Sequence, residues 1–278
     1  MAQFRGVGTM TALFGGVPPA LVGTIFAVVF VGGLVKGTAG FGYAIVSTAV
    51  LAALVSPAVA VVVMILPTLV ANVRLLGELD RTDLRTCLVR FWPYVVAAGA
   101  GTVVGMALLG HIPRPVLALF LGVFTLGYVA VTQDRVRLPG ERWVRDRCLR
   151  PGTTAKVGVG LASGVVFGAS NVAVQVVAYL DSLNLDRSTF VGVLAMILVG
   201  ISALRLGLAW SLGLFTAGDT GAVALVALSG VGAVPGLVGV TLGQHLRRRL
   251  EERYVGLGAL ALLSLIGVKL TLDGVTGI

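Results

Sequence analysis

The chain alternates between long apolar runs without charge and short connections that carry most of its charged residues. A helix rises 1.5 Å per residue, so about 20 apolar residues cross the roughly 30 Å apolar core of a bilayer. The apolar runs lie at about 17–35, 39–55, 57–76, 91–110, 115–132, 157–180, 188–206, 220–243 and 254–272. This pattern predicts an all-α integral membrane protein.

Two of the apolar stretches are not compatible with a single straight helix. The charge-free stretch 37–73 is too long for one crossing and must turn back. Ser56-Pro57 is its natural break, because proline ends one helix and suits the first turn of the next. Glycine recurs along the segment 157–180, a composition that is typical of an interrupted membrane helix.

Three connections are basic, namely 77–90, 133–156 and 246–253. The positive-inside rule places all three on the cytoplasmic side of the membrane. An even number of crossings must then separate the second connection from the third, although three apolar segments lie between them. The condition is met if 157–180 is a helical hairpin that returns to the cytoplasmic side.

The two halves of the chain contain similar motifs in the same order. The matches are GLVKG with GLASG (33–37 and 160–164), Phe41-Gly42 with Phe167-Gly168, Arg74 with Arg205, and GTVVG with GAVPG (101–105 and 232–236). We expect two homologous repeats, 1–132 and 157–278, joined by the basic connection 133–156. Each repeat is a broken helix or hairpin followed by about three transmembrane helices. An odd number of crossings per repeat predicts that the repeats are inverted, as in many transporters.

The composition agrees with lipid as the main solvent. Hydrophobic residues make up 57% and charged residues 12% of the chain, against about 25% charged residues in soluble proteins. The net charge of +9 comes from the connections, so the positive-inside rule explains it better than a nucleic-acid partner does. The two cysteines and two histidines form no metal-binding spacing. We therefore expect no nucleic acid, no metal and no cofactor.

Three stretches carry a family resemblance. They are GGLVKGTAGFGYAIVSTAVL (32–51), the proline-led span that ends in Arg74 before GELD, and GLASGVVFGASN (160–171). In these stretches the sequence resembles the TauE/SafE family of membrane proteins, also called the sulfite exporter or TSUP family. The similarity extends from about Val28 to Leu270. The resemblance implies a duplicated fold of about eight membrane segments and transport, often export, of sulfite, sulfoacetate or related sulfur oxyanions.

Lys36 is the first candidate for substrate binding, because it is distant in sequence from other charges and precedes a glycine-rich break. A lysine inside a membrane segment costs about 3 kcal/mol unless it is paired, hydrated or bound to an anion. The half-helix N-terminus after the break attracts anions, so the candidates on this break are Thr38, Gly40, Phe41 and Gly42. An equally weighted alternative is that Lys36 extends to the lipid headgroups.

The second repeat offers uncharged polar side chains and an arginine. Ser170 and Asn171 directly follow the glycine break, and Gln175 shares a helix face with Asn171. The guanidinium group of Arg205 matches the geometry of sulfite or sulfonate oxygens. These four residues are candidate substrate-binding residues. For the amides the alternative is a hydrogen bond that ties two helices together.

Other polar residues in the spans have open or structural roles. Asn72 fits either a substrate contact or a contact between helices, and Arg74 is best interpreted as an anchor at the membrane interface. No Asp or Glu lies clearly within a predicted span, so the sequence gives no support for a carboxylate proton relay.

We therefore expect a secondary transporter that exports small sulfur-containing anions (sulfite, sulfoacetate or a similar organosulfonate) across the bacterial inner membrane as a multi-pass protein. Its partners are the anion and the lipid bilayer, and a homo-oligomer is compatible with the sequence. Two alternatives stay open: an importer of another small anion such as a carboxylate, and a non-transporting structural membrane subunit. A membrane-embedded enzyme would need a His/Asp/Glu or Ser–base cluster, which the sequence lacks.

Overall fold

The computed structural model of the chain describes residues 17–39, 42–76, 81–132, 153–181, 187–216, 222–246 and 252–277, which are helical apart from short turns. The first half contains α2 (Pro19–Ala39), α3 (Tyr43–Ala52), α4 (Pro57–Val63), α5 (Ile65–Leu76), α6 (Arg81–Leu109) and α7 (Arg114–Thr132). The second half contains α9 (Thr153–Ser170), α10 (Val174–Asp181), α11 (Arg187–Ser211), the short 3₁₀ helix η1 (Leu214–Thr216), α12 (Ala222–Leu246) and α13 (Glu252–Thr276).

Several of these helices are long and apolar enough to cross a membrane. In the described residues, five candidate spans satisfy length and composition: Pro19–Thr38, Pro57–Arg74, Phe91–Leu109, Gly192–Ser211 and Ala224–Leu246. Shorter apolar helices lie at Tyr43–Ala52, Arg114–Gly127 and Lys156–Ser170. The prediction of an all-α integral membrane protein is therefore confirmed. The division at 132, 133–156 and 157 stays a prediction, although α9 already begins at Thr153.

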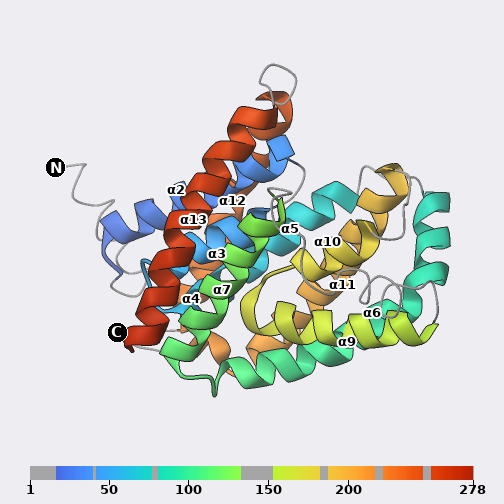
Figure 1. The fold of residues 1–278 in the computed structure, drawn as a ribbon, viewed down its shortest axis with the longest axis horizontal. Coiled ribbons are helices and arrows are strands. Elements are labelled where there is room, and N and C mark those ends of the chain that lie inside the picture. The colour runs from blue at the N-terminus through green and yellow to red at the C-terminus, as the bar shows by residue number, and fades with distance from the viewer. Residues whose placement is uncertain are drawn as a thin grey trace.

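Each half opens with an interrupted pair of helices. In the first half, Gly42 precedes α3 in the left-handed conformation, with φ of 91°, which glycine adopts without steric cost. In the second half, residues 171–173 separate α9 from α10, and Asn171 has φ of 62°. Figure 1 shows α10 turning back from the end of α9. The segment 157–180 is thus an interrupted helix pair that turns back, as predicted, and its return to the cytoplasmic side stays a prediction.

The break between α3 and α4 also follows the sequence prediction. Ser56 has an extended backbone and its side chain accepts a hydrogen bond from the Val59 backbone N–H at 3.4 Å, while Pro57 begins α4. Proline suits this first helical position, because the missing N–H would have no partner inside the helix. Helices α4 and α5 then continue as one candidate span, interrupted only at Met64.

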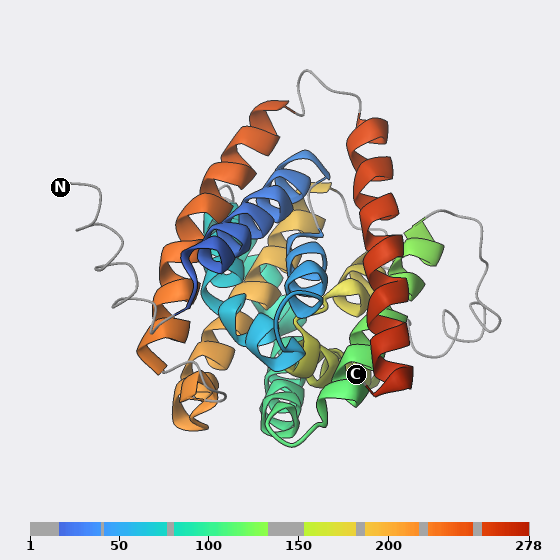
Figure 2. The ribbon, with the colours of Figure 1, turned by 90° about the vertical axis from the view of Figure 1, so that its left-hand side faces the viewer.

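The helices of the two halves pack in exchanged pairs. In the two halves, α2 corresponds to α9 and α6 corresponds to α12. Helix α2 of the first half packs along α12 of the second, and α9 of the second half packs along α6 of the first. Two further counterpart pairs pack on each other, α5 on α11 and α7 on α13. Figure 1 shows the exchanged pairs on opposite parts of the molecule, and Figure 2 shows α2 beside α12 and α7 beside α13. This pattern is unchanged when the halves are interchanged, which indicates an approximate two-fold relation between them.

Glycines at the helix contacts establish the relative directions of the helices. Cβ atoms built on Gly33 and Gly37 would lie 2.3 and 2.2 Å from the carbonyl oxygens of Gly236 and Val240, so α2 and α12 run parallel. Glycine is required here because the backbones touch. The same geometry makes α6 and α9 parallel, since Gly101 and Gly105 lie against the carbonyl groups at 161 and 165.

The pair α7 and α13 runs in opposite directions. A Cβ atom on Gly122 would meet Thr271, while one on Gly274 would meet Leu119, so residue numbers rise along one helix as they fall along the other. Because α7 and α13 occupy the same place in the two halves, their opposite directions are consistent with inverted repeats. The orientation of each half in a bilayer stays a prediction.

The register of the repeat differs from the one that the sequence motifs suggested. Gly37 packs against Gly243, and Gly168 packs in the same way against Gly105. Gly33 and Gly37 therefore correspond to Gly164 and Gly168 instead of to residues 160 and 164. The motif at 101–105 likewise corresponds to 239–243 instead of to 232–236. Glycine recurs about once per turn in these helices, so a shift by whole turns leaves the apparent motif intact.

Two glycines of α2 provide a matched test of this packing. Gly37→Ala should lower the free energy of unfolding by about 1–3 kcal/mol, because its Cβ would force α2 away from α12. Gly23→Ala should hold or raise stability, since a Cβ there meets nothing within 4 Å and alanine favours a helix by roughly 1 kcal/mol. The measurement is the thermal unfolding of both purified variants. Equal stability of the two would contradict close packing at Gly37.

The native cysteines test the predicted orientation, because Cys87 and Cys148 lie in two of the basic connections. Single-cysteine variants made with Cys148→Ser and Cys87→Ser should resist a membrane-impermeant thiol reagent in intact cells and react after the cells are opened. The mass increase of the protein reports the reaction. Gly110→Cys in a cysteine-free chain is the external control and should react in intact cells. Reaction of Cys87 or Cys148 in intact cells would overturn the orientation.

Candidate functional site

Among the residues that the structure describes, two cationic side chains lie buried inside the bundle of helices. Lys36, in the last turn of α2, is 8% exposed, and Arg205, in α11, is fully buried. None of the five candidate spans contains Asp or Glu. Two buried positive charges therefore lie in segments that supply no negative side chain of their own.

The ammonium group of Lys36 is held by a neutral amide. Its Nζ donates a hydrogen bond of 2.6 Å to Oδ1 of Asn72, which is fully buried on α5. Lys36 therefore points into the protein and does not extend to the lipid headgroups. An amide oxygen stabilises the ammonium group through a charge-assisted hydrogen bond but leaves its charge uncompensated.

The guanidinium group of Arg205 is also held by an amide. Its Nη1 donates to Oδ1 of Asn171, the residue at the break between α9 and α10. The Nδ2 of Asn171 donates to the hydroxyl oxygens of Thr48 on α3, at 3.1 Å, and Thr68 on α5, at 3.4 Å. Asparagine tolerates the left-handed backbone at this break better than most residues do. One side chain thus links the break in the second half to two helices of the first.

These two networks meet on α5. Thr68 and Asn72 are four residues apart, so they lie on one face of that helix, one turn from each other. Thr68 accepts a hydrogen bond from Asn171, which in turn holds Arg205, and Asn72 accepts a hydrogen bond from Lys36. We call the group Lys36, Thr48, Thr68, Asn72, Asn171 and Arg205 the two-cation site.

Part of the hydrogen-bonding capacity of the two-cation site is unused. Arg205 lies over the ring of Phe167, with 4.9 Å from Cζ to the ring centroid. Within the described residues, Nε and Nη2 of Arg205 and Nδ2 of Asn72 are buried without a hydrogen-bond partner. Buried donors are rarely left unpaired. All three are donors, which is the chemistry that an anion with several oxygen atoms requires.

The other candidates from the sequence lie outside this network or outside the described residues. Thr38 donates its hydroxyl to the carbonyl oxygens of Leu34 and Val35, at 2.9 and 3.1 Å. Ser170 donates to the Val166 carbonyl oxygen at 2.6 Å and accepts from the Val172 N–H at 3.2 Å. Both hydroxyl groups therefore stabilise the ends of their own helices.

Four more candidates lie at or beside the two breaks. Gly42 supplies the turn before α3, whose N-terminus has no side-chain cap. Gly40 and Phe41 fall outside the described residues, and for Gln175 the structure describes only the backbone, in α10. Arg74 is exposed, as expected of an interfacial anchor.

The sequence interpretation did not include Thr48, Thr68 or Phe167 among the candidates. Thr68 carries a usable signal, because it stands one helical turn before Asn72 in an otherwise apolar span. Thr48 and Phe167 carry none, since isolated threonine and phenylalanine residues are common in apolar helices. A contact across the two halves brings Thr48 to Asn171, and a contact within the second half brings Phe167 to Arg205.

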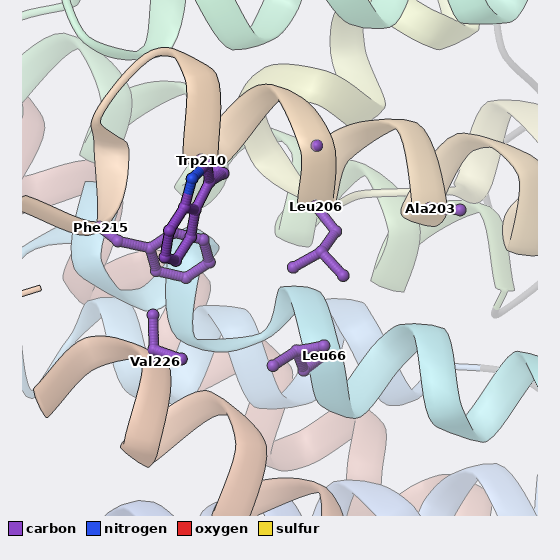
Figure 3. Close-up of a pocket in the computed structure, with 7 residues that line it drawn as sticks. Leu66, Ala203, Leu206, Trp210, Phe215 and Val226 are labelled. Atoms are coloured by element: carbon purple, nitrogen blue, oxygen red, sulfur yellow. The ribbon is translucent and has the colours of Figure 1, made fainter. Parts of the chain in front are cut away.

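A separate pocket of about 450 Å³ lies between α5, α11, α12 and η1. Its lining is apolar: Leu66, Ala203, Leu206, Gly207, Trp210, Phe215 and Val226. Figure 3 shows the side chains of Trp210 and Phe215 close together at one end and that of Leu66 on the facing helix. Because it offers no charged group, this pocket does not fit an inorganic anion, and the candidate functional site is the two-cation site.

The fold and this site define a multi-pass α-helical membrane protein in which two interrupted helix pairs meet at a buried positive centre. Secondary transporters commonly have this architecture. The family model for the sulfite exporter TauE/SafE matches residues 25–270, which is most of the chain. The chain therefore belongs to the TauE/SafE sulfite exporter family, and this membership implies a membrane transporter of sulfur anions such as sulfite. Searches among curated proteins and among solved structures gave no match.

Proposed function

We propose that this protein is a secondary transporter that exports sulfite, sulfoacetate or a similar small organosulfonate across the bacterial inner membrane. The observation that carries the proposal is the burial of Lys36 and Arg205 in spans without a carboxylate. The substrate binds between these two cations, in the two-cation site. No metal or cofactor takes part, and the protein is not an enzyme.

The electrostatics of the site support an anionic substrate. Transferring an ion from water into a protein interior costs several kcal/mol even after relaxation. The amides of Asn72 and Asn171 offset part of this cost for Lys36 and Arg205, but they carry no charge. An anion between the two cations would neutralise charge and give the free guanidinium donors their partners. Guanidinium groups suit sulfite and sulfonate, because their N–H groups pair with two oxygens at once.

The position of the site supports transport rather than static binding. Lys36 and Asn171 adjoin the breaks of the first and second half, and the two networks meet where the halves pack together. Transporters with inverted repeats hold their substrate at this kind of meeting point, close to the middle of the membrane. Rocking of one half against the other would then expose the same site to either side.

The membrane potential favours the outward direction. An anion that leaves a cell with a negative interior gains about 2.3 kcal/mol per charge for each 100 mV. The positive-inside rule predicts that the basic connections lie in the cytoplasm. Export therefore needs no coupling ion, in keeping with spans that contain no carboxylate for a proton relay.

Flux from proteoliposomes loaded with sulfite tests this function. Wild-type protein should release sulfite faster than protein-free vesicles, and faster still when the vesicle interior is made negative. Lys36→Met and Arg205→Met should each lower the initial rate at least about tenfold, because the anion loses one of the two cations that attract it. Arg74→Met is the matched control: Arg74 holds the equivalent place in the first half but is exposed, so its rate should stay near wild type.

Unfolding measurements separate loss of function from loss of fold. Arg205 bonds to an amide and not to a carboxylate, so its replacement removes a desolvation cost without leaving an opposite charge unpaired, and Arg205→Met should unfold no earlier than wild type. Taurine, a sulfonate with an ammonium group, should be released more slowly than sulfoacetate because the two cations repel it. Equal sulfite flux in all three variants would overturn the assignment of the site. Flux of a carboxylate but not of any sulfur anion would favour the importer alternative.

A further inference from the structure

The amide oxygens of Asn72 and Asn171 hold positions on the two cations that an anionic substrate would also occupy. Asn72 Oδ1 lies 2.6 Å from the ammonium nitrogen of Lys36, and Asn171 Oδ1 accepts from Nη1 of Arg205. These oxygens therefore compete with substrate oxygens for the same positive charges. An anion is the stronger acceptor, because it adds the direct attraction of opposite charges to the charge-assisted hydrogen bond that the amide already makes.

We propose that Asn72 and Asn171 are specificity-determining residues that act as weak internal ligands, which an anion displaces from Lys36 and Arg205. The proposal rests on the proposed function, because it concerns the same site. A carboxylate at either position would neutralise its cation permanently and exclude the substrate. An amide holds the cation in place, leaves its charge available and yields to a negatively charged ligand but not to a neutral one.

Asn171 also connects this exchange to the fold. Its Nδ2 donates to Thr48 and Thr68, and these bonds direct its oxygen towards Arg205. Displacement of that oxygen by an anion would turn the amide and weaken its bonds to α3 and α5. Substrate binding would then loosen the link between the break at residues 171–173 and the first half. A carrier that moves one half against the other needs such a link to depend on its load.

The isosteric variants Asn72→Asp and Asn171→Asp test the proposal. Each places a carboxylate on its cation without changing the shape of the side chain, and aspartate tolerates the left-handed backbone at position 171. Sulfite binding to purified protein, measured by calorimetry, should weaken at least about tenfold in each variant, because coupling energies between close charge pairs are that large. Thermal unfolding should show both variants at least as stable as wild type, since each gains an ion pair.

A second comparison checks that the effect comes from pairing with the cation. Asn72→Asp should raise the melting temperature in the wild-type background and lower it in the Lys36→Met background, where the carboxylate would be buried alone. The corresponding comparison pairs Asn171→Asp with Arg205→Met. A buried carboxylate that merely disturbs packing would lower the melting temperature in both backgrounds.

The outcomes distinguish this proposal from the function on which it rests. Wild-type protein that binds sulfite while both aspartate variants bind it equally well would overturn the role of the asparagines and leave the proposed function standing. Aspartate variants that fail to fold would also overturn it, because an ion pair should stabilise the site. Wild-type protein that binds no sulfur anion would instead contradict the proposed function.

Discussion

The burial of two cations without a carboxylate is the constraint on which the site depends. Lys36 and Arg205 lie inside a bundle whose candidate spans contain no Asp or Glu. Each charge costs several kcal/mol in such surroundings unless it is compensated. Neutral amides and the face of Phe167 supply partial compensation. The protein therefore retains a positive potential at its centre, which a small anion can neutralise. An apolar residue in place of either cation would avoid this cost, so a bound anion is the explanation that we favour for both charges.

Close helix packing brings this centre together. Parallel contacts through glycine place α2 against α12 and α9 against α6, so each half holds the interrupted helix of the other. Within this frame the break at residues 171–173 directs the amide of Asn171 inward, where it contacts Arg205, Thr48 and Thr68. The two halves are not equivalent at the site. In the register set by the glycine contacts, Phe167 occupies the place of Lys36, and exposed Arg74 occupies the place of buried Arg205. An approximate symmetry of the backbone thus carries an asymmetric site.

Local signals were sufficient to predict the spans, the breaks and the two cations. Apolar runs, Ser56-Pro57 and the recurring glycines determine local structure directly, and Lys36 and Arg205 stand out as charges in apolar sequence. The partners of these charges depend on contacts between distant residues and have no local signal. Asn171 contacts Thr48 across the two halves, and nothing in either neighbourhood marks the pair. The predicted alignment of the two repeats was shifted by whole helical turns for a related reason. Glycines that recur about once per turn match equally well after such a shift. The hydroxyl groups of Thr38 and Ser170 bond to the backbone of their own helices and so lie outside the two-cation site, a use of helical hydroxyl groups that the sequence does not reveal.

The most direct test of the central claim is a structure of the protein with selenite, a heavier analogue of sulfite whose selenium atom can be located by anomalous scattering. We expect one selenium position within hydrogen-bonding reach of both Lys36 and Arg205, with the amide oxygens of Asn72 and Asn171 displaced from those cations. Selenite bound elsewhere in a protein that still transports sulfite, with both amide contacts intact, would contradict the central claim.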